Sequence, residues 1–351
     1  DFYMNRLWPN KSLLDVKDFV VLFVSVEYSI VAKGYSLFYY YSDTGKQKYF
    51  SRLNDPKNAL CSKIRLLRRL LRTEIRCLYH FQNDTWMCIA KKGIFKYHPK
   101  TRLFEKCCEI EKGSRPMCLC QSNDGTIYYG EYCYNPARKP MRIFQSKDNG
   151  DSWSVAYTFV DGTINHIHGI FQDPFSEKVW VATGDEDSAC ILGYTEDGFK
   201  TFVPRFEGNQ KYRVCQPLFT ADEIIFATDS PLEQNYIRSI NRVTGIVKDI
   251  CTIQGSGIYG AQSGNLMMIS TTVEPSTINL DDHSHLWYSF DGYKWKELSS
   301  YKKDCWNQIY FQFGSIRFPN FEGPTSYIAY NGRALKGIDQ KSVIVSICDL
   351  I

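Results

Sequence analysis

The chain has 351 residues, 44% of them hydrophobic, with 42 lysines and arginines against 38 aspartates and glutamates. This balanced charge excludes a strongly basic nucleic-acid-binding domain, and the hydrophobic content is sufficient for a large core. No segment rich in proline, serine and glycine divides the chain, so we expect one domain over residues 1–351.

The first predicted element is the apolar run "FVVLFVSV" at residues 19–26. Eight apolar residues are too few to cross a membrane and enough for a buried strand. No basic segment followed by an apolar one precedes it, so no signal peptide is visible, although a leader before Asp1 stays open. The 13 cysteines follow neither a disulfide-framework nor a zinc-site spacing, which favours a reducing compartment and a cytoplasmic location.

The next element is a short basic helix in the region 60–73, with the sequence "SKIRLLRRLLR" at residues 62–72. Leucine and isoleucine recur at helical spacing, and arginines fill the positions between them. These arginines are Arg65, Arg68, Arg69 and Arg72. We expect an insertion helix that packs on the domain with its arginines in solvent, or alternatively a peripheral contact with an anionic surface.

Short runs of β-branched and aromatic residues, separated by turn residues, cover the rest of the chain. Residues 115–159, 166–206, 212–253 and 257–298 each contain four strand-sized pieces and three turns, in a repeat of about 40–50 residues. Weaker copies occupy 19–53, 76–110 and 308–350. This pattern predicts an all-β propeller of four-stranded antiparallel blades, seven in number, or six if the first and last units share a blade.

Three of the predicted turns between third and fourth strands have related sequences: "SKDNGDSW" at 146–153, "TEDGFKTF" at 195–202 and "SFDGYKW" at 289–295. The first resembles the Asp-box pattern at every defined position, and the others resemble it in part. The chain thus resembles the Asp-box, or BNR-repeat, β-propellers, which include sialidases and other carbohydrate-active proteins. We expect Asp148 to hold its own turn through hydrogen bonds, because the turn lies on the rim opposite the mouth.

Acidic residues recur one repeat apart where the second strands of successive blades end. They are Glu131, Asp185, Asp229 and Glu274. The first strands of the same blades begin with basic, imidazole or phenol side chains at Arg115, His166, His168, Tyr212, Arg213 and Tyr259. Because both positions lie on one rim of a propeller, these residues predict a polar pocket for a charged ligand at the axial mouth. For each acid alone, a structural role in a turn is an equal alternative.

The pair "HIH" is the most specific element of this set. His166 and His168 alternate with Ile167, so on a strand both imidazoles point to one face, as metal ligation, proton transfer or sugar contact requires. No cofactor is expected apart from a divalent metal at these two histidines. His283 and His285 have the same spacing, but we place them in a loop or at the start of a third strand.

The sialidase branch of the resemblance implies three arginines that grip a carboxylate, matched here by Arg115, Arg213 and Arg317. It also implies a tyrosine nucleophile, matched by Tyr259 with Glu274 or Glu131. However, the arginine motif of that branch is absent, and no motif fixes an acid/base aspartate. A second branch, the propeller polysaccharide lyases, would use His166, His168, Tyr212 and Arg213 for elimination.

We therefore expect a protein that binds an acidic oligo- or polysaccharide and cleaves a glycosidic bond, with a lyase and a non-catalytic glycan-binding scaffold as alternatives. The predicted catalytic residues are His166, His168, Glu131, Asp185, Asp229 and Tyr259. The predicted substrate-binding residues are Arg115, Tyr132, Tyr212, Arg213, Glu274 and Arg317.

Overall fold

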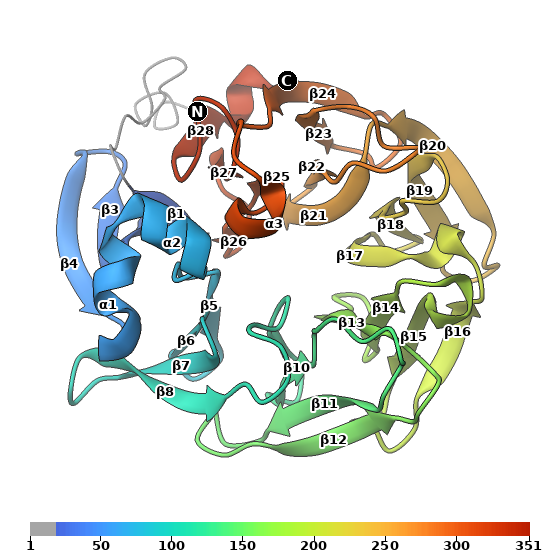
Figure 1. Cartoon of the computed structure of the whole chain (residues 1–351), viewed down its shortest axis with the longest axis horizontal. Coiled ribbons are helices and arrows are strands. Elements are labelled where there is room, and N and C mark those ends of the chain that lie inside the picture. The colour runs from blue at the N-terminus through green and yellow to red at the C-terminus, as the bar shows by residue number, and fades with distance from the viewer. Residues whose placement is uncertain (1–18) are drawn as a thin grey trace.

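The computed structural model describes residues 19–351 and arranges its strands as a ring of small sheets around a central axis (Figure 1). Residues 1–18 of the predicted domain lie outside the described residues.

The first three blades contain β1 (Val20–Val24), β2 (Ser29–Lys33), β3 (Ser36–Tyr41), β4 (Lys46–Arg52), β5 (Cys77–Phe81), β6 (Thr85–Ala90), β7 (Gly93–His98), β8 (Leu103–Glu109), β9 (Cys120–Gln121), β10 (Ile127–Gly130), β11 (Met141–Ser146) and β12 (Ser154–Phe159). The next three contain β13 (His166–Gln172), β14 (Val179–Gly184), β15 (Ile191–Thr195), β16 (Val203–Glu207), β17 (Val214–Phe219), β18 (Glu223–Thr228), β19 (Asn235–Asn241), β20 (Val247–Ile253), β21 (Ser256–Ser263), β22 (Leu266–Val273), β23 (His283–Ser289) and β24 (Lys296–Lys302). The last contains β25 (Gly314–Arg317), β27 (Tyr327–Arg333) and β28 (Ser342–Ser346), and β26 (Asn320–Phe321) pairs in parallel with β1.

The strand order gives seven blades among the described residues, so the predicted propeller is confirmed and the six-blade alternative is wrong. Within each blade, consecutive strands pair in an antiparallel meander. The seventh blade has three strands of its own, and a short pairing between β22 and β25 joins it to the sixth. His283 and His285 lie on β23, a third strand.

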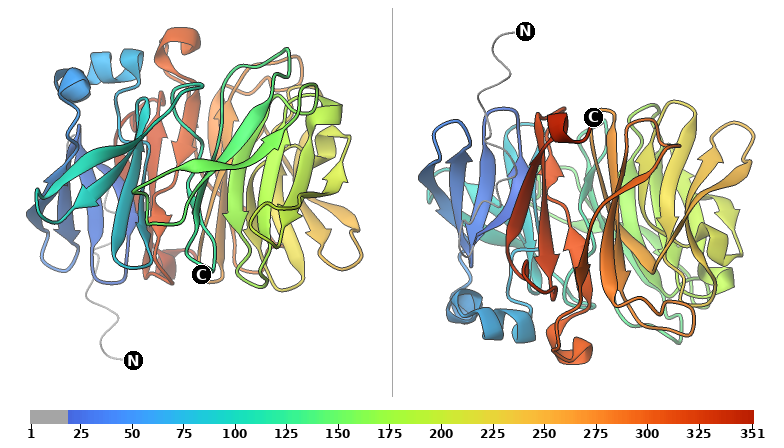
Figure 2. Two further views of the ribbon diagram at one scale, coloured as in Figure 1. Left: turned by 90° about the horizontal axis from the view of Figure 1, so that it is seen from below. Right: turned by 90° about the horizontal axis from the view of Figure 1, so that it is seen from above.

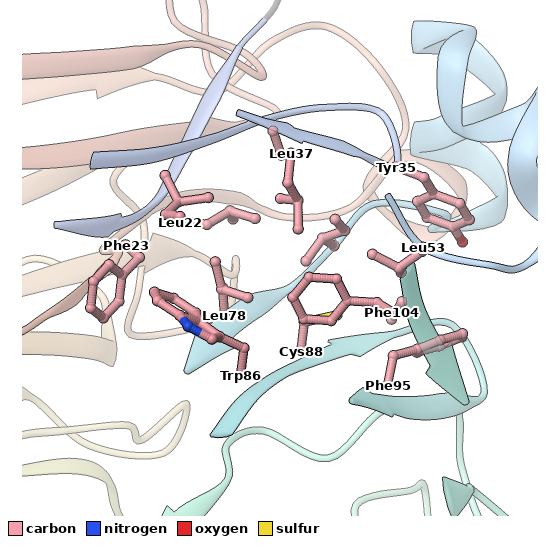
Figure 3. Packing of buried hydrophobic residues seen from close by; sticks show 14 of the residues in the cluster. Leu22, Phe23, Tyr35, Leu37, Leu53, Leu78, Trp86, Cys88, Phe95 and Phe104 are labelled. Atoms are coloured by element: carbon pink, nitrogen blue, oxygen red, sulfur yellow. The ribbon is translucent and has the colours of Figure 1, made fainter. Parts of the chain in front are cut away.

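Position within a blade explains the residue types of each strand. The second strands β6, β14, β18 and β22 are buried along their whole length, so they are almost continuously apolar or small. The outermost strands, such as β16, are mostly exposed and carry charged residues. The core lies between neighbouring blades: Phe23 and Trp86, for example, meet edge to face at 5.0 Å between ring centroids (Figure 3).

The three related turns share one hydrogen-bond arrangement. In the first, Ser146 Oγ donates to Asp148 Oδ1 at 2.8 Å, and the Ser152 backbone N–H donates to the same oxygen at 2.9 Å. Asp197 and Asp291 accept from the backbone of their own turns in the same way. Each turn joins the third and fourth strands of its blade, so each lies on the rim opposite the starts of the first strands.

Helices α1 (Pro56–Lys63), α2 (Arg65–Leu71) and α3 (Gln308–Phe311) stand on one rim of the ring (Figure 2), and short 3-10 turns occupy Asp187–Ala189, Gln210–Tyr212 and Ile347–Asp349. The predicted insertion helix is present, but the prediction that its arginines face solvent is wrong for two of them. Arg68 and Arg69 are buried. Arg68 donates to Gln340 Oε1 and Arg69 to Asp304 Oδ2, so polar partners in the last blade and its neighbouring loop turn this face inward.

No helix in residues 19–351 has the length and apolar character to span a membrane.

Candidate functional site

A pocket of about 290 Å³ lies at the axial mouth, on the rim where α2 and α3 end, because Arg72 and Gln312 after these helices line it. The sequence places residues here because first strands begin and second strands end at this rim. Ten of the twelve predicted site residues line it: Arg115, Tyr132, His166, His168, Asp185, Arg213, Asp229, Tyr259, Glu274 and Arg317. Most of the predicted site residues therefore lie together in one pocket.

Two predicted residues lie elsewhere. Glu131 is buried, and its carboxylate accepts hydrogen bonds from the Arg142 backbone and guanidinium, so an ion pair on the flank of the third blade holds it. Tyr212 is partly buried and packs against the core beside Phe206, with ring centroids 5.7 Å apart. Neither residue lines the mouth pocket.

The centre of the pocket wall is formed by the two histidines of β13 and by Asp185, which follows β14. The two imidazole Nε2 atoms are 3.1 Å apart, and Asp185 Oδ1 is 3.4 Å from His166 Nε2 and 3.5 Å from His168 Nε2. Burial raises the pKa of Asp185, but the two histidines outweigh burial and hold this pKa well below its usual range. Asp185 is therefore ionised.

Arg213 links the acids of two neighbouring blades. Its Nη2 lies 2.8 Å from Asp185 Oδ1, and its Nε lies 3.5 Å from Asp229 Oδ2. Cys215 donates to Asp229 Oδ2 at 3.3 Å. Burial raises the pKa of Cys215 well above its usual value, so its thiol stays protonated and is not a nucleophilic thiolate.

The arginines of the pocket differ in how far acids neutralise them. Arg115 Nη1 donates to Glu74 Oε1 at 2.9 Å, and both side chains are buried. In contrast, Arg317 Nη1 is 4.0 Å from that oxygen, and neither Nη1 nor Nε has a hydrogen-bond partner within residues 19–351. Arg76 Nε donates to the backbone oxygen of Met117, and Arg76 Nη2 donates to the sulfur of the same residue. No carboxylate in the described chain forms an ion pair with Arg76.

Glu274, after β22, is the acid with the strongest tendency to hold a proton. Burial, with the negative charge of Asp229 as a further cause, raises the pKa of Glu274 to about 7. Its carboxyl group has no cation within 4.0 Å among residues 19–351. Glu274 can therefore act as a proton donor near neutral pH.

Sequence reasoning missed Arg72, Arg76, Cys215 and Gln312, which also line the pocket. Arg76 immediately precedes β5, so the rule that first strands begin at the mouth identifies its position when it is applied to the second blade. Arg72 and Gln312 follow α2 and α3, and no repeat position marks them.

A wider pocket of about 620 Å³ opens on the other side of the ring and shares Arg76, Met117, Tyr259 and Arg317 with the mouth pocket.

The comparisons with solved structures support the fold. A chain of the Mitotic Checkpoint Complex is similar, with TM-score 0.56, 10% identity and 97% of each chain covered. The extracellular domain of a putative hybrid two-component system from B. thetaiotaomicron has TM-score 0.57 and 15% identity, over 95% of this chain and 39% of that one. A GH74 enzyme from Niastella koreensis has TM-score 0.56 and 14% identity, over 90% of this chain and 51% of that one.

The protein is a β-propeller. No family of known proteins and no curated protein sequence matches the chain. The chain spans about two fifths of the two-component protein and half of the GH74 enzyme, and at these identities the likeness extends to the fold alone.

Proposed function

We propose that this propeller binds an acidic glycan in the mouth pocket and cleaves a glycosidic bond. One observation carries the proposal. Among the described residues, no carboxylate lies at hydrogen-bond distance from Arg76 or Arg317, and both line one pocket with Glu274, whose pKa is raised. Two guanidinium groups suit a sugar carboxylate, since each can donate two parallel hydrogen bonds to it.

In the proposed reaction, Glu274 donates its proton to the glycosidic oxygen as the bond from this oxygen to the anomeric carbon breaks. A water molecule supplies the new oxygen at the anomeric carbon, and its proton passes to a carboxylate of the pocket, with Asp185 and Asp229 available. Tyr259 lies under the guanidinium of Arg317, with 5.2 Å between its ring centroid and Cζ. A tyrosine nucleophile at this position, as in sialidase-like propellers, is the covalent variant of the proposal.

The contacts of the arginines change which of them we assign to binding the carboxylate of the glycan. Arg115 is neutralised by Glu74, and Arg213 by Asp185 and Asp229. We therefore assign the grip to Arg317 with Arg76 in place of Arg115 and Arg213. The resemblance of the three turns to the Asp-box pattern supports a carbohydrate-active protein, but the turns themselves take no part in the site.

The first test is a binding and cleavage assay with oligosaccharides that contain uronic acid or sialic acid. Calorimetry measures affinity, chromatography detects new reducing ends, and ultraviolet absorbance detects the double bond that only an elimination creates. We expect binding and hydrolysis of one class. A gain of absorbance instead favours the lyase, and binding without products favours the scaffold.

Arg317→Met tests the assigned grip, with the exposed Arg52→Met as its matched control. Because a charge-assisted hydrogen bond contributes about 1.5–3 kcal/mol, we expect Arg317→Met to weaken acidic-glycan binding roughly 10- to 100-fold. The fold should tolerate the change, since Arg317 Nε and Nη1 already lack partners. Equal affinity of wild type and Arg317→Met for every acidic glycan that binds would contradict the assignment.

A further inference from the structure

Three potential metal-ligand atoms converge on one point of the pocket wall. They are His166 Nε2, His168 Nε2 and Asp185 Oδ1, separated pairwise by 3.1, 3.4 and 3.5 Å. Ligands about 2.0–2.2 Å from a metal are separated by roughly 2.8–3.1 Å in octahedral and roughly 3.3–3.6 Å in tetrahedral geometry. The spacing of the three atoms is therefore that of three ligands on one face of a metal ion.

The other ring nitrogens determine where the protons of the two histidines lie. His166 Nδ1 is 3.2 Å from the Cys133 carbonyl oxygen, and His168 Nδ1 is 2.8 Å from the Val214 carbonyl oxygen. A carbonyl oxygen only accepts, so each Nδ1 carries the hydrogen and donates it. Both Nε2 atoms therefore point at the other ring and at the Asp185 carboxylate.

When neither Nε2 carries a hydrogen, the three atoms are acceptors that face one another, and a cation between them relieves their repulsion. A proton on one Nε2 can satisfy only one contact at a time, whereas a divalent metal accepts all three lone pairs. Imidazole with its Nδ1 hydrogen on a carbonyl is also the usual form of a metal-binding histidine, because the second hydrogen bond fixes the ring.

The surroundings hold the three groups in place. Asn165 Oδ1 accepts from the Asp185 backbone N–H at 3.1 Å, and Arg213 donates to the Asp185 side chain. At Gly184, a Cβ atom would lie 2.5 Å from His168 Cε1, so glycine leaves the space that the ring occupies. The His168 ring is buried, while the Asp185 side chain is 38% exposed, so the open side of the convergence point faces the pocket.

We propose that His166, His168 and Asp185 form a binding site for a divalent transition metal, with Zn²⁺ as the first candidate, whose remaining coordination positions open into the mouth pocket. Two imidazoles and one carboxylate suit zinc and its neighbours more than calcium or magnesium, which prefer oxygen ligands alone. A metal with three protein ligands keeps a position for water or a substrate oxygen.

Metal binding by the full chain tests this site without any glycan, so its result is separate from that of the proposed function. Chelator-treated protein is dialysed against Zn²⁺, and bound metal is measured by mass spectrometry. We expect about one equivalent in wild type and at least about tenfold weaker binding in Asp185→Asn and His166→Gln. Zn²⁺ should also raise the melting temperature of wild type but not of these variants.

His283→Gln is the matched control, because His283 belongs to a more exposed cluster with Asp281 and Asp282. We expect this variant to bind metal as wild type does. Loss of binding in His283→Gln, or equal binding in wild type and Asp185→Asn, would overturn the proposal.

Cobalt substitution of wild type covers the case in which a variant does not fold. Visible absorption of bound Co²⁺ without a thiolate charge-transfer band supports the proposed ligands. A thiolate band would place the ion at the alternative cluster of His168, Cys215 and Asp229 and would overturn the assignment, as would a wild type that binds no Co²⁺.

Discussion

At the residue scale, some charged side chains of the pocket form ion pairs with one another, whereas others stay available for a ligand. Arg115 and Glu74 form a buried pair, and Arg213 is held between Asp185 and Asp229. In the described part of the chain, Arg317 and Glu274 have no such partner at hydrogen-bond distance. Burial lowers the pKa of Arg317 to about 10, so its guanidinium group keeps its charge at neutral pH.

The raised pKa of Glu274 predicts a pH-dependent stability. The folded protein holds this proton up to about pH 7, whereas the unfolded chain releases it near 4.5. The folded state thus binds more protons between these values, so the Glu274 contribution to stability is present below about pH 4.5 and is lost as pH rises to 7. Relative to wild type, we expect Glu274→Gln to gain stability on the order of 1–3 kcal/mol between pH 5 and pH 8.

Urea unfolding of chelator-treated protein at both pH values measures this change. Glu27→Gln, at an exposed position, is the control and should follow wild type. A Glu274→Gln variant whose stability relative to wild type is the same at pH 5 and pH 8 would contradict the predicted pKa.

At the element scale, α2 is attached to the propeller through its arginines. Arg69 Nη1 lies 2.6 Å from Asp304 Oδ2, and its Nη2 donates to the Phe311 carbonyl oxygen of α3 at 2.9 Å. These contacts connect α2 with the region before the last blade, and Arg72 and Gln312 at the ends of these helices line the mouth pocket. The insertion therefore builds part of the pocket wall with Arg68 and Arg69 buried, while Arg65 and Arg72 stay exposed.

Arg69→Met is expected to destabilise the fold by about 2–3 kcal/mol, because it removes a buried cation that lies 2.6 Å from Asp304 and 3.5 Å from Asp339. Lys303 stays paired with Asp304, so the loss is smaller than for a carboxylate left with no cation. Arg65 also forms an ion pair, with Asp339, but its side chain is 61% exposed. Arg65→Met should therefore cost at most about 1 kcal/mol. Thermal and urea unfolding of the two variants measure the contrast, and equal losses would show that the ion pair of Arg69 is not the attachment.

At the scale of the whole molecule, the ring closes between its first and last blades through side chains. The Val21 backbone N–H donates to Ser342 Oγ at 2.8 Å, and Asn331 Nδ2 donates to the Val21 carbonyl oxygen at 2.8 Å. Apolar residues of both blades, including Val24 and Ile344, pack into one cluster beside these bonds. Closure thus uses buried polar contacts and apolar packing together with the short parallel pair of β1 and β26.

Ser342→Ala tests the closure, since it leaves the buried Val21 N–H without an acceptor. We expect a loss of about 1–3 kcal/mol in the free energy of unfolding and faster amide exchange in β1. Ser346→Ala on the same strand is the control, because Ser346 is only half-buried. Unchanged exchange in β1 of Ser342→Ala would mean that the remaining contacts close the ring alone.

The sequence by itself determined the blades and the rim on which each strand end lies. A four-stranded meander fixes the direction of every strand once the repeat is phased, and the turns at Asp148, Asp197 and Asp291 supply that phase. For this reason, the sequence alone assigns His166, Asp185 and Arg213 to one mouth.

Only the tertiary structure decided which charged groups remain free there. The partner of Arg115 is Glu74, 41 residues away, and that of Arg69 is Asp304, 235 residues away, so no local spacing encodes either pair. Glu131 occupies a repeat position of the mouth acids, yet Arg142 turns it away from the axis. A strand pattern specifies where a side chain begins, whereas its charge partners come from other blades and loops that meet only when the ring closes.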